Sequence, residues 1–196
     1  MNCKLLPLRL LLLLGLAGCH QEDPVLAAAK AAWKGDAAAL ERALSRGVSP
    51  DATEAPNAAE GGRPLILIAF EGPGGIVSAE ILLRHGADIN AMGAIQRTAL
   101  MEAAEGPVLE RVEYLLRHGA DPNIEDSEGQ TALFYLNSDN GNGNGGYALG
   151  IARMLVMAGA DPCHKNKVGK PPEWREQAPL SVAGQYLADA CHRKNE

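Results

Sequence analysis

Aromatic residues are scarce in this chain of 196 residues: they make up 4% of it, although 46% of all residues are hydrophobic. A β-sandwich core draws heavily on aromatic and β-branched side chains, so this composition disfavours that class. The apolar positions are rich in alanine and leucine, which suit short helices packed closely together. We therefore expect an all-α fold.

An excess of positive charge is absent too. The chain carries 18 Lys and Arg residues against 24 Asp and Glu, which gives a formal net charge of −6 at pH 7. Binding to nucleic-acid phosphates requires cationic side chains in excess, so we expect neither DNA nor RNA as a partner. An acidic chain is equally unsuited to bind anionic lipid through its overall charge.

Signatures of catalysis are missing as well. The sequence has no Gly-x-Ser-x-Gly nucleophile elbow and no His-Glu-x-x-His zinc motif. Its acidic residues, among them Glu102, Glu105, Glu110 and Glu113, have the spacing of a solvated helix face rather than of a catalytic pair. We expect no enzyme, no cofactor and no small-molecule substrate.

The N-terminal segment contains a short apolar run. Residues 10–17 read LLLLLGLA and follow Lys4 and Arg9, and the run is too short to cross a bilayer as a permanent helix. This pattern is typical of a secretory signal peptide. Its end, Leu16-Ala17-Gly18-Cys19, resembles the lipobox of bacterial lipoproteins, which are cleaved before the cysteine and acylated on its thiol.

The lipobox resemblance implies that residues 1–18 are removed and that a short tether, residues 19–24, begins with lipidated Cys19. Cleavage changes the formal net charge from −6 to −8, because the signal carries two cations and no acid. His20 is not the aspartate that retains lipoproteins in the inner membrane, so the resemblance points to the periplasmic face of the outer membrane. We expect the membrane contact to be made by the acyl chains.

One phrase recurs along the chain. Residues 82–88 and 115–121 both read LLRHGAD, residues 155–161 read LVMAGAD, and a degenerate first version, ALSRGVSPD, occupies residues 43–51. Their glycines are 33 to 40 residues apart, a period typical of a solenoid of stacked helical units. We expect each glycine to take a positive φ where an outer helix ends and each aspartate to bond the backbone of the following turn.

These phrases resemble the end of an ankyrin repeat, Gly-Ala-Asp-x-Asn, which follows a turn, a short inner helix and a short outer helix. Residues 86–90 and 119–123 match in full, whereas residues 159–163 end in Cys163. The resemblance implies an all-α ankyrin-repeat solenoid over residues 25–196, with about four repeats and a degenerate C-terminal cap. The expected bounds of the repeats are residues 25–51, 62–90, 96–123 and 129–163, and those of the cap are residues 169–193.

Local signals refine this expectation. Asp23 and Pro24 predict the N-cap and first residue of an Ala-rich helix that ends near Trp33. His85 and His118 precede the turn at equivalent positions, so we expect them to cover helix ends rather than to bind a metal. Residues 180–193 predict the capping helix that the end of a solenoid requires.

Two stretches depart from the period. Residues 72–75, GPGG, predict a longer loop between the two helices of the second repeat. Residues 137–146, NSDNGNGNGG, add about seven residues between the helices of the fourth. This insertion is either a tolerated flexible loop or a loop that is reshaped on contact with a partner.

Two cysteines remain once the signal is removed and Cys19 carries lipid. An even pair in an oxidising compartment predicts a disulfide between Cys163 and Cys191, which would tie the cap to the fourth repeat. The alternative is a metal-binding or enzymatic site that uses both cysteines and the histidine after each, His164 and His192. Adjacent side chains seldom converge on one ion, which disfavours this alternative.

Ankyrin stacks bind other proteins through the tips of their turns and the surface of their inner helices, so the resemblance places a protein partner there. A stack of repeats makes an extended surface whose exposed residues can vary without disturbing the fold. Matching positions across repeats gives these candidate contact residues: Glu60, Arg63, Ile95, Arg97, Met101, Ser127, Glu128, Gln130, Phe134 and Tyr135.

We therefore expect a monomeric, non-catalytic, protein-binding lipoprotein of the bacterial envelope. Periplasmic ankyrin lipoproteins include immunity proteins against secreted, type VI lipase-like effectors, so the resemblance implies that role. An acidic surface suits a basic toxin, because opposite charges speed association. An envelope scaffold and a stress-protective partner of a periplasmic enzyme remain as alternatives.

Overall fold

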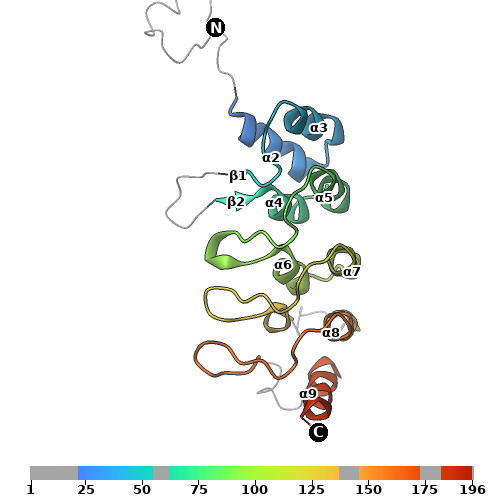
Figure 1. Cartoon of the computed structure of the whole chain (residues 1–196). Helices are drawn as coiled ribbons and strands as arrows, with labels where there is room; N and C mark the ends of the chain where they lie inside the picture. The colour runs from blue at the N-terminus through green and yellow to red at the C-terminus, as the bar shows by residue number, and fades with distance from the viewer. Residues whose placement is uncertain (1–21, 55–61, 137–145, 173–181, 196) are drawn as a thin grey trace, which may run out of the picture.

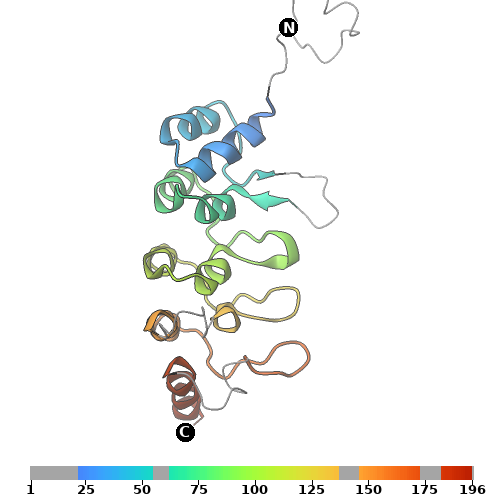
Figure 2. The same cartoon turned by 180° about the vertical axis from the view of Figure 1, so that it is seen from behind.

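The computed structural model describes residues 22–54, 62–136, 146–172 and 182–195 of the chain. They form an elongated stack of helical units, in which the first and the last described helices lie at opposite ends (Figure 1). An inner and an outer row of helices run along the stack, and loops project from the side of the inner row (Figure 2). The predicted all-α solenoid is confirmed.

The inner row consists of α2 (Pro24–Lys34), α4 (Leu65–Glu71), α6 (Ala99–Glu105) and the short 3-10 helix η3 (Ala132–Tyr135). The outer row consists of α3 (Ala37–Ser45), α5 (Gly75–Arg84), α7 (Leu109–Arg117) and α8 (Gly146–Met157), and α9 (Val182–Lys194) packs against α8 at the end of the stack. Two short strands, β1 (Thr53–Glu54) and β2 (Arg63–Pro64), pair antiparallel before α4, and η2 (Ala94–Gln96) lies in the loop before α6. Within the described ranges, no helix is long and apolar enough to cross a membrane.

The first unit begins as its sequence predicts. The side chain of Asp23 accepts a hydrogen bond from the backbone N–H of Val25 at 2.8 Å, and Pro24 is the first helical residue of α2. Alanines on one face of this helix are buried against α4, because their small side chains let the two backbones approach closely. The helix ends at Lys34, one residue beyond the predicted end.

A single hydrophobic core runs through the stack. The first unit adds buried alanines from α2 and leucines from α3, and the later units add buried leucines or isoleucines from both rows. All of these side chains belong to one continuous cluster, so neighbouring units stabilise one another. The largest fully buried side chains are Leu40, Leu65, Ile66, Leu67, Leu82, Leu100, Met101, Leu115, Leu133, Ile151, Leu155 and Leu187.

The recurring phrase ends each outer helix as predicted. Gly86, Gly119 and Gly159 have φ values of 88°, 89° and 96°, a region that a residue with a Cβ atom rarely adopts. The histidine before the turn also behaves as expected: the ring Nδ1 of His118 bonds the carbonyl oxygen of Tyr114 at 2.8 Å. His85 instead bonds a carboxylate oxygen of Glu41 at 2.7 Å, a contact that lowers the pKa of Glu41.

The residue four positions after each of these glycines links one unit to the next. Asn90 accepts a hydrogen bond from the backbone N–H of Asp121 at 2.9 Å, and Asn123 does the same for Asp161 at 2.9 Å. The first unit uses Asp51, which accepts from the N–H of Asp88 at 2.7 Å. We call this series of contacts between turns the turn ladder.

The predicted long loop in the second unit is wrong. Gly75 is already part of α5, so three residues join α4 to α5, as three residues join α6 to α7. The glycines do not lengthen the loop; they let its backbone approach the end of α2 closely. A Cβ atom at Gly72 would overlap the carbonyl group of Trp33, and Gly74 donates its N–H to the same carbonyl oxygen at 3.2 Å.

The fourth unit differs from the others in its inner helix. Where we expected an α-helix, residues 132–135 form the 3-10 helix η3, followed by extended backbone at Leu136. Residues 137–145 of the predicted insertion lie outside the described residues, and α8 begins at Gly146. The predicted capping helix is confirmed as α9.

Candidate protein-binding site

The inner row and its loops form the surface on which most of the predicted contact residues lie. Arg63, Arg97 and Gln130 occupy equivalent positions at the start of the inner helices, and Ser127 and Glu128 are exposed at the tip of the next loop. Ile95 is 55% exposed at its loop tip and has a φ of 53°, so an apolar side chain is held out to solvent there. Glu60 lies outside the described residues.

Each of the two arginines on this surface is neutralised within its own unit. Arg63 forms an ion pair with Glu71, and Arg97 forms one with Glu105 at 2.5 Å. In both units the carboxylate lies at the end of the inner helix that the arginine precedes. Because both cations are already paired, they do not give the surface a net positive charge.

Arg97 also connects two units. Its guanidinium lies 4.1 Å from the ring centre of Tyr135, a cation–π contact. The hydroxyl of Tyr135 donates to a carboxylate oxygen of Asp126; burial first, and then this contact, raises the pKa of Tyr135. Asp126 is 3% exposed and accepts further hydrogen bonds from the N–H groups of Glu128 and Gln130, both at 2.8 Å. This network fixes the tip of the fourth loop relative to the third unit.

Glu102 is the least satisfied acid on this surface. It lies on α6, and one carboxylate oxygen is buried with no hydrogen-bond partner among the described residues. Burial raises the pKa of Glu102, while the nearby charges of Arg97 and Arg63 act in the opposite direction. A donor group brought by a partner would satisfy this oxygen.

A hollow of about 240 Å³ opens at the N-terminal end of the same surface. Its floor is apolar and includes Leu26, Trp33 and Ile68, and Trp33 is 47% exposed. Charged residues surround it: Lys30, Lys34, Glu54, Arg63 and Glu71. An apolar floor with an exposed tryptophan and a charged rim is typical of the central contact in a protein interface.

Sequence reasoning missed Trp33 and Leu26. The tryptophan only marked the end of a predicted helix, because the period assigns residues to a row of the stack and does not show which side chains of neighbouring inner helices enclose a hollow. The signal was present nevertheless: Trp33 is one of two tryptophans in the chain and stands in a helix whose other large side chains are few.

Two predicted contact residues lie elsewhere than expected. Met101 is 1% exposed, and its sulfur accepts a hydrogen bond from the N–H of Thr98 at the start of α6, so the prediction that it contacts a partner is wrong. Its side chain caps the helix and fills the core. Phe134 is half-buried, with its ring edge-on to the ring of His164 at 5.9 Å between centres.

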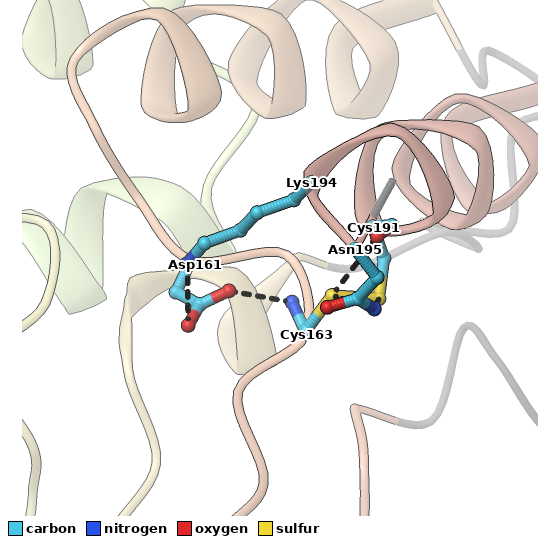
Figure 3. Close-up of a disulfide and its surroundings, with 5 residues drawn as sticks. All are labelled: Asp161, Cys163, Cys191, Lys194 and Asn195. Carbon is cyan, nitrogen blue, oxygen red and sulfur yellow. Dashed lines mark hydrogen bonds and ion pairs between the residues drawn. A yellow bond between two sulfur atoms is a disulfide. The ribbon is translucent and has the colours of Figure 1, made fainter.

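The two cysteines lie together at the C-terminal end. Cys163 and Cys191 form a disulfide whose Cα atoms are 5.1 Å apart, between the last turn and α9 (Figure 3). Lys194 forms an ion pair with Asp161 at 2.8 Å beside it. Partial burial disfavours the charged form of Asp161, but the hydrogen bonds from Lys194 and from the N–H of Cys163 outweigh it and lower the pKa of Asp161.

These contacts leave the metal alternative without support. His164 bonds the carbonyl oxygen of Gly129 at 3.0 Å, and a disulfide offers no thiolate ligand. Over the part of the chain that the structure describes, no group of three or more His, Cys, Asp or Glu residues is placed to hold a metal ion.

Comparison with known proteins agrees with this geometry. The family model for ankyrin repeats matches residues 25–166 in three copies. No curated protein gives a significant sequence match. Ankyrin repeats are typically non-catalytic binding domains that recognise other proteins. The chain therefore belongs to the ankyrin-repeat family and carries a protein–protein interaction module.

Proposed function

We propose that this protein is a lipid-anchored, non-catalytic immunity protein of the bacterial envelope, which binds a secreted lipase-like effector in the periplasm and blocks it. The observation that carries the binding role is the apolar hollow around Trp33 on the inner-row surface. The lipobox-like end of the N-terminal segment supports the anchor. An anchor holds the inhibitor beside the lipid that such an effector attacks.

The surface specifies the chemistry of the partner. An apolar or aromatic side chain of the effector fills the hollow against Trp33 and Ile68, where it is removed from water. Basic side chains beside that anchor meet the acids of the surface, which include Glu54, Glu102 and Glu128. Arg63 and Arg97 are paired internally and Lys30 forms an ion pair with Glu22, which lowers the repulsion that a basic partner meets from these three cations.

A capture experiment tests the binding role. The full-length protein, solubilised from the envelope in mild detergent, is used to capture partners from cells that secrete lipases. Trp33→Ala removes the anchor of the hollow. Tyr147→Ala is the matched control, because Tyr147 is a comparably exposed aromatic residue, 44% against 47%, on the outer-row helix α8.

We expect the wild-type protein and the Tyr147→Ala variant to capture the same partner and the Trp33→Ala variant to lose it by a factor of ten or more, the cost of about 1.4 kcal/mol or more at an interface anchor. Equal capture by all three proteins would show that the hollow is not the binding site. A competition experiment tests the immunity role: cells that lack the gene should be killed by sister cells, and wild-type protein should rescue them. Full survival of those cells would favour the scaffold or stress-protective alternative.

A further inference from the structure

The N-terminal end of the stack carries a second hollow, which shares no lining residue with the hollow around Trp33. It has a volume of about 510 Å³, and its lining residues all belong to the first unit. The residues around it come from the start of α2, from α3 and from the turn after α3: Glu22, Pro24, Ala27, Ala39, Arg42, Ala43, Arg46 and Val48. Small apolar side chains form the floor, and two arginines stand over it.

The position of Arg42 holds a large uncharged side chain in the other units: Ile81, Tyr114 and Met154. Counted back from the glycine that ends each outer helix, Arg42 is equivalent to Ile81, which is 4% exposed in the core. At the end of the stack the same position is exposed and charged. Arg46 is the C-cap residue of α3, four positions after Arg42, and both exposed arginines line the same hollow.

Neither arginine is neutralised by a residue that the structure describes. Among the described residues, the side chains of Arg42 and Arg46 make no hydrogen bond or ion pair, whereas the acids nearby are engaged. Glu22 pairs with Lys30 at 2.5 Å, and Glu41 bonds Arg84 at 2.9 Å on the opposite side of α3. Asp36 caps α3 by accepting the N–H of Ala39 at 2.9 Å. Two unpaired cations therefore stand together in a chain that is acidic overall.

The chain before this hollow is short. Cys19 precedes Glu22 by three residues, which reach at most about 11 Å even when fully extended. If Cys19 carries the lipid, Glu22 at the edge of the hollow is held within that distance of the bilayer, and Arg42 and Arg46 line the same hollow. The planar guanidinium group binds phosphate oxygens through two parallel hydrogen bonds, so a phospholipid headgroup complements this pair.

We infer that this end of the stack, which we call the membrane end, docks on the phospholipid headgroups of the membrane that holds the anchor, with Arg42 and Arg46 on lipid phosphate. The inference rests on the lipid anchor of the proposed function. Docking holds the stack upright and leaves the hollow around Trp33 free for the partner. The overall negative charge does not prevent it, because charges far from the surface are screened within about 10 Å.

A simpler role for the arginines is to keep an uncapped end soluble, since terminal repeats need a polar outer face. Any polar pair fulfils that role, so the two roles predict different variants. The double variant Arg42→Lys with Arg46→Lys keeps the positive charge, so it should still dock. The double variant Arg42→Glu with Arg46→Glu keeps a polar surface but reverses the charge, so it should fulfil only the capping role. Both double variants should fold, which thermal unfolding checks.

The test uses the acylated full-length protein in vesicles of phosphatidylethanolamine and phosphatidylglycerol, with detergent micelles as the reference. Phenylglyoxal modifies accessible arginines, and mass spectrometry of the peptides reports the rate at each site. We expect modification of Arg42 and Arg46 to slow roughly fivefold or more in vesicles, in line with the contribution of one cation near an anionic surface. Arg193, which is exposed on α9 at the far end of the stack, should react equally in both.

Three outcomes would overturn the inference. Equal protection in vesicles of digalactosyldiacylglycerol, which lacks phosphate, would mean shielding by proximity alone. Equal protection by inorganic phosphate in micelles would mean a site for the free ion. Unchanged rates in phospholipid vesicles would mean no docking.

Backbone hydrogen exchange gives a second measurement. Exchange in α3 should slow on vesicles for the wild-type protein and the lysine variant, and it should not slow for the glutamate variant. Equal slowing in all three would support the simpler capping role. Intact mass distinguishes failure of the proposed function from failure of this inference. If Cys19 carries no acyl chains, the lipid anchor of the proposed function is wrong. If Cys19 is acylated but the two arginines stay reactive in vesicles, only the docking is wrong.

Discussion

The side-chain oxygen of Asn123 accepts a hydrogen bond from the backbone N–H of Asp161 at 2.9 Å, and its amide donates to the carbonyl oxygen of Gly159 at 3.0 Å. One side chain thus bonds both a donor and an acceptor in the next turn of the ladder. The equivalent residue one unit later is Cys163, which has no further Gly-Ala-Asp turn to bond. Its disulfide to Cys191 replaces the missing contact with a covalent one.

Replacing Asn123 by alanine should weaken the contact between the third and fourth units. We expect the free energy of unfolding to fall by about 1 to 2 kcal/mol, because two hydrogen bonds between turns are lost and their backbone partners must bond water. Urea unfolding measures the change. Asn90→Ala is the matched comparison and should cost less, since its amide is 3.5 Å from the carbonyl oxygen of Gly119. A larger loss at Asn90 than at Asn123 would contradict the ladder.

Breaking the disulfide should loosen the C-terminal end first. The bridge closes a sequence separation of 28 residues, and in the chain-entropy model its removal costs about 3 to 4 kcal/mol. For the paired substitution Cys163→Ser with Cys191→Ser, we expect hydrogen exchange to rise in α9 before it rises in α4 or α5. Two free thiols in the mature oxidised protein, detected by labelling without denaturant, would show that the bridge does not form.

Gly72→Ala should destabilise the junction between the first two units. A Cβ atom there overlaps the carbonyl group of Trp33, so the units must move apart at a cost of about 1 to 3 kcal/mol. Gly106→Ala is the matched control, because Gly106 also follows an inner helix in extended conformation and its Cβ atom would lie 3.6 Å from the nearest atom. We expect the midpoint temperature of thermal unfolding to fall only for Gly72→Ala. A comparable fall for both variants would show that the loss does not come from overlap with Trp33 but from a property that both glycines share.

Glu102→Gln should raise stability at neutral pH and weaken partner binding. Burial raises the pKa of Glu102 in the folded state above its ordinary value of 4.5, so the folded protein holds a proton that the unfolded chain releases. This contribution to stability is present below pH 4.5 and is lost as the pH rises through the folded pKa. Urea unfolding on both sides of that window should show a pH-dependent loss in the wild-type protein that the glutamine variant lacks. Identical pH profiles would mean that Glu102 titrates normally.

The phrase LLRHGAD was enough to predict the ends of the outer helices, because a glycine with positive φ and an aspartate that bonds its own turn are properties of a few consecutive residues. The N-cap at Asp23 followed from the same local logic. The cysteine pair was predicted by parity, without any knowledge of distance. Local chemistry thus determined the rows of the stack and the units that compose it.

The partner surface depended on contacts between units, which no local pattern encodes. The two ends of the contact between Arg97 and Tyr135 are 38 residues apart, and the hollow around Trp33 requires α4 to lie beside α2. The sequence indicated that Gly72 is a loop residue, but the close approach of its backbone to Trp33 appears only in the folded stack. Met101 read as a surface anchor because its position faces the partner side in a regular repeat, yet its flexible side chain turns into the core.

The sequence by itself therefore determined an acidic stack of ankyrin-type units, since period, glycine and aspartate act within a few residues. Only the tertiary structure decided which charges are paired and which remain free. Arg63 and Arg97 are neutralised by the glutamates at the far ends of their own inner helices, whereas Arg42 and Arg46, at the end of the stack, have no ion-pair partner among the described residues. The reason is physical: an ion pair depends on the distance between two groups in space, and spacing along the chain specifies that distance only within a helix.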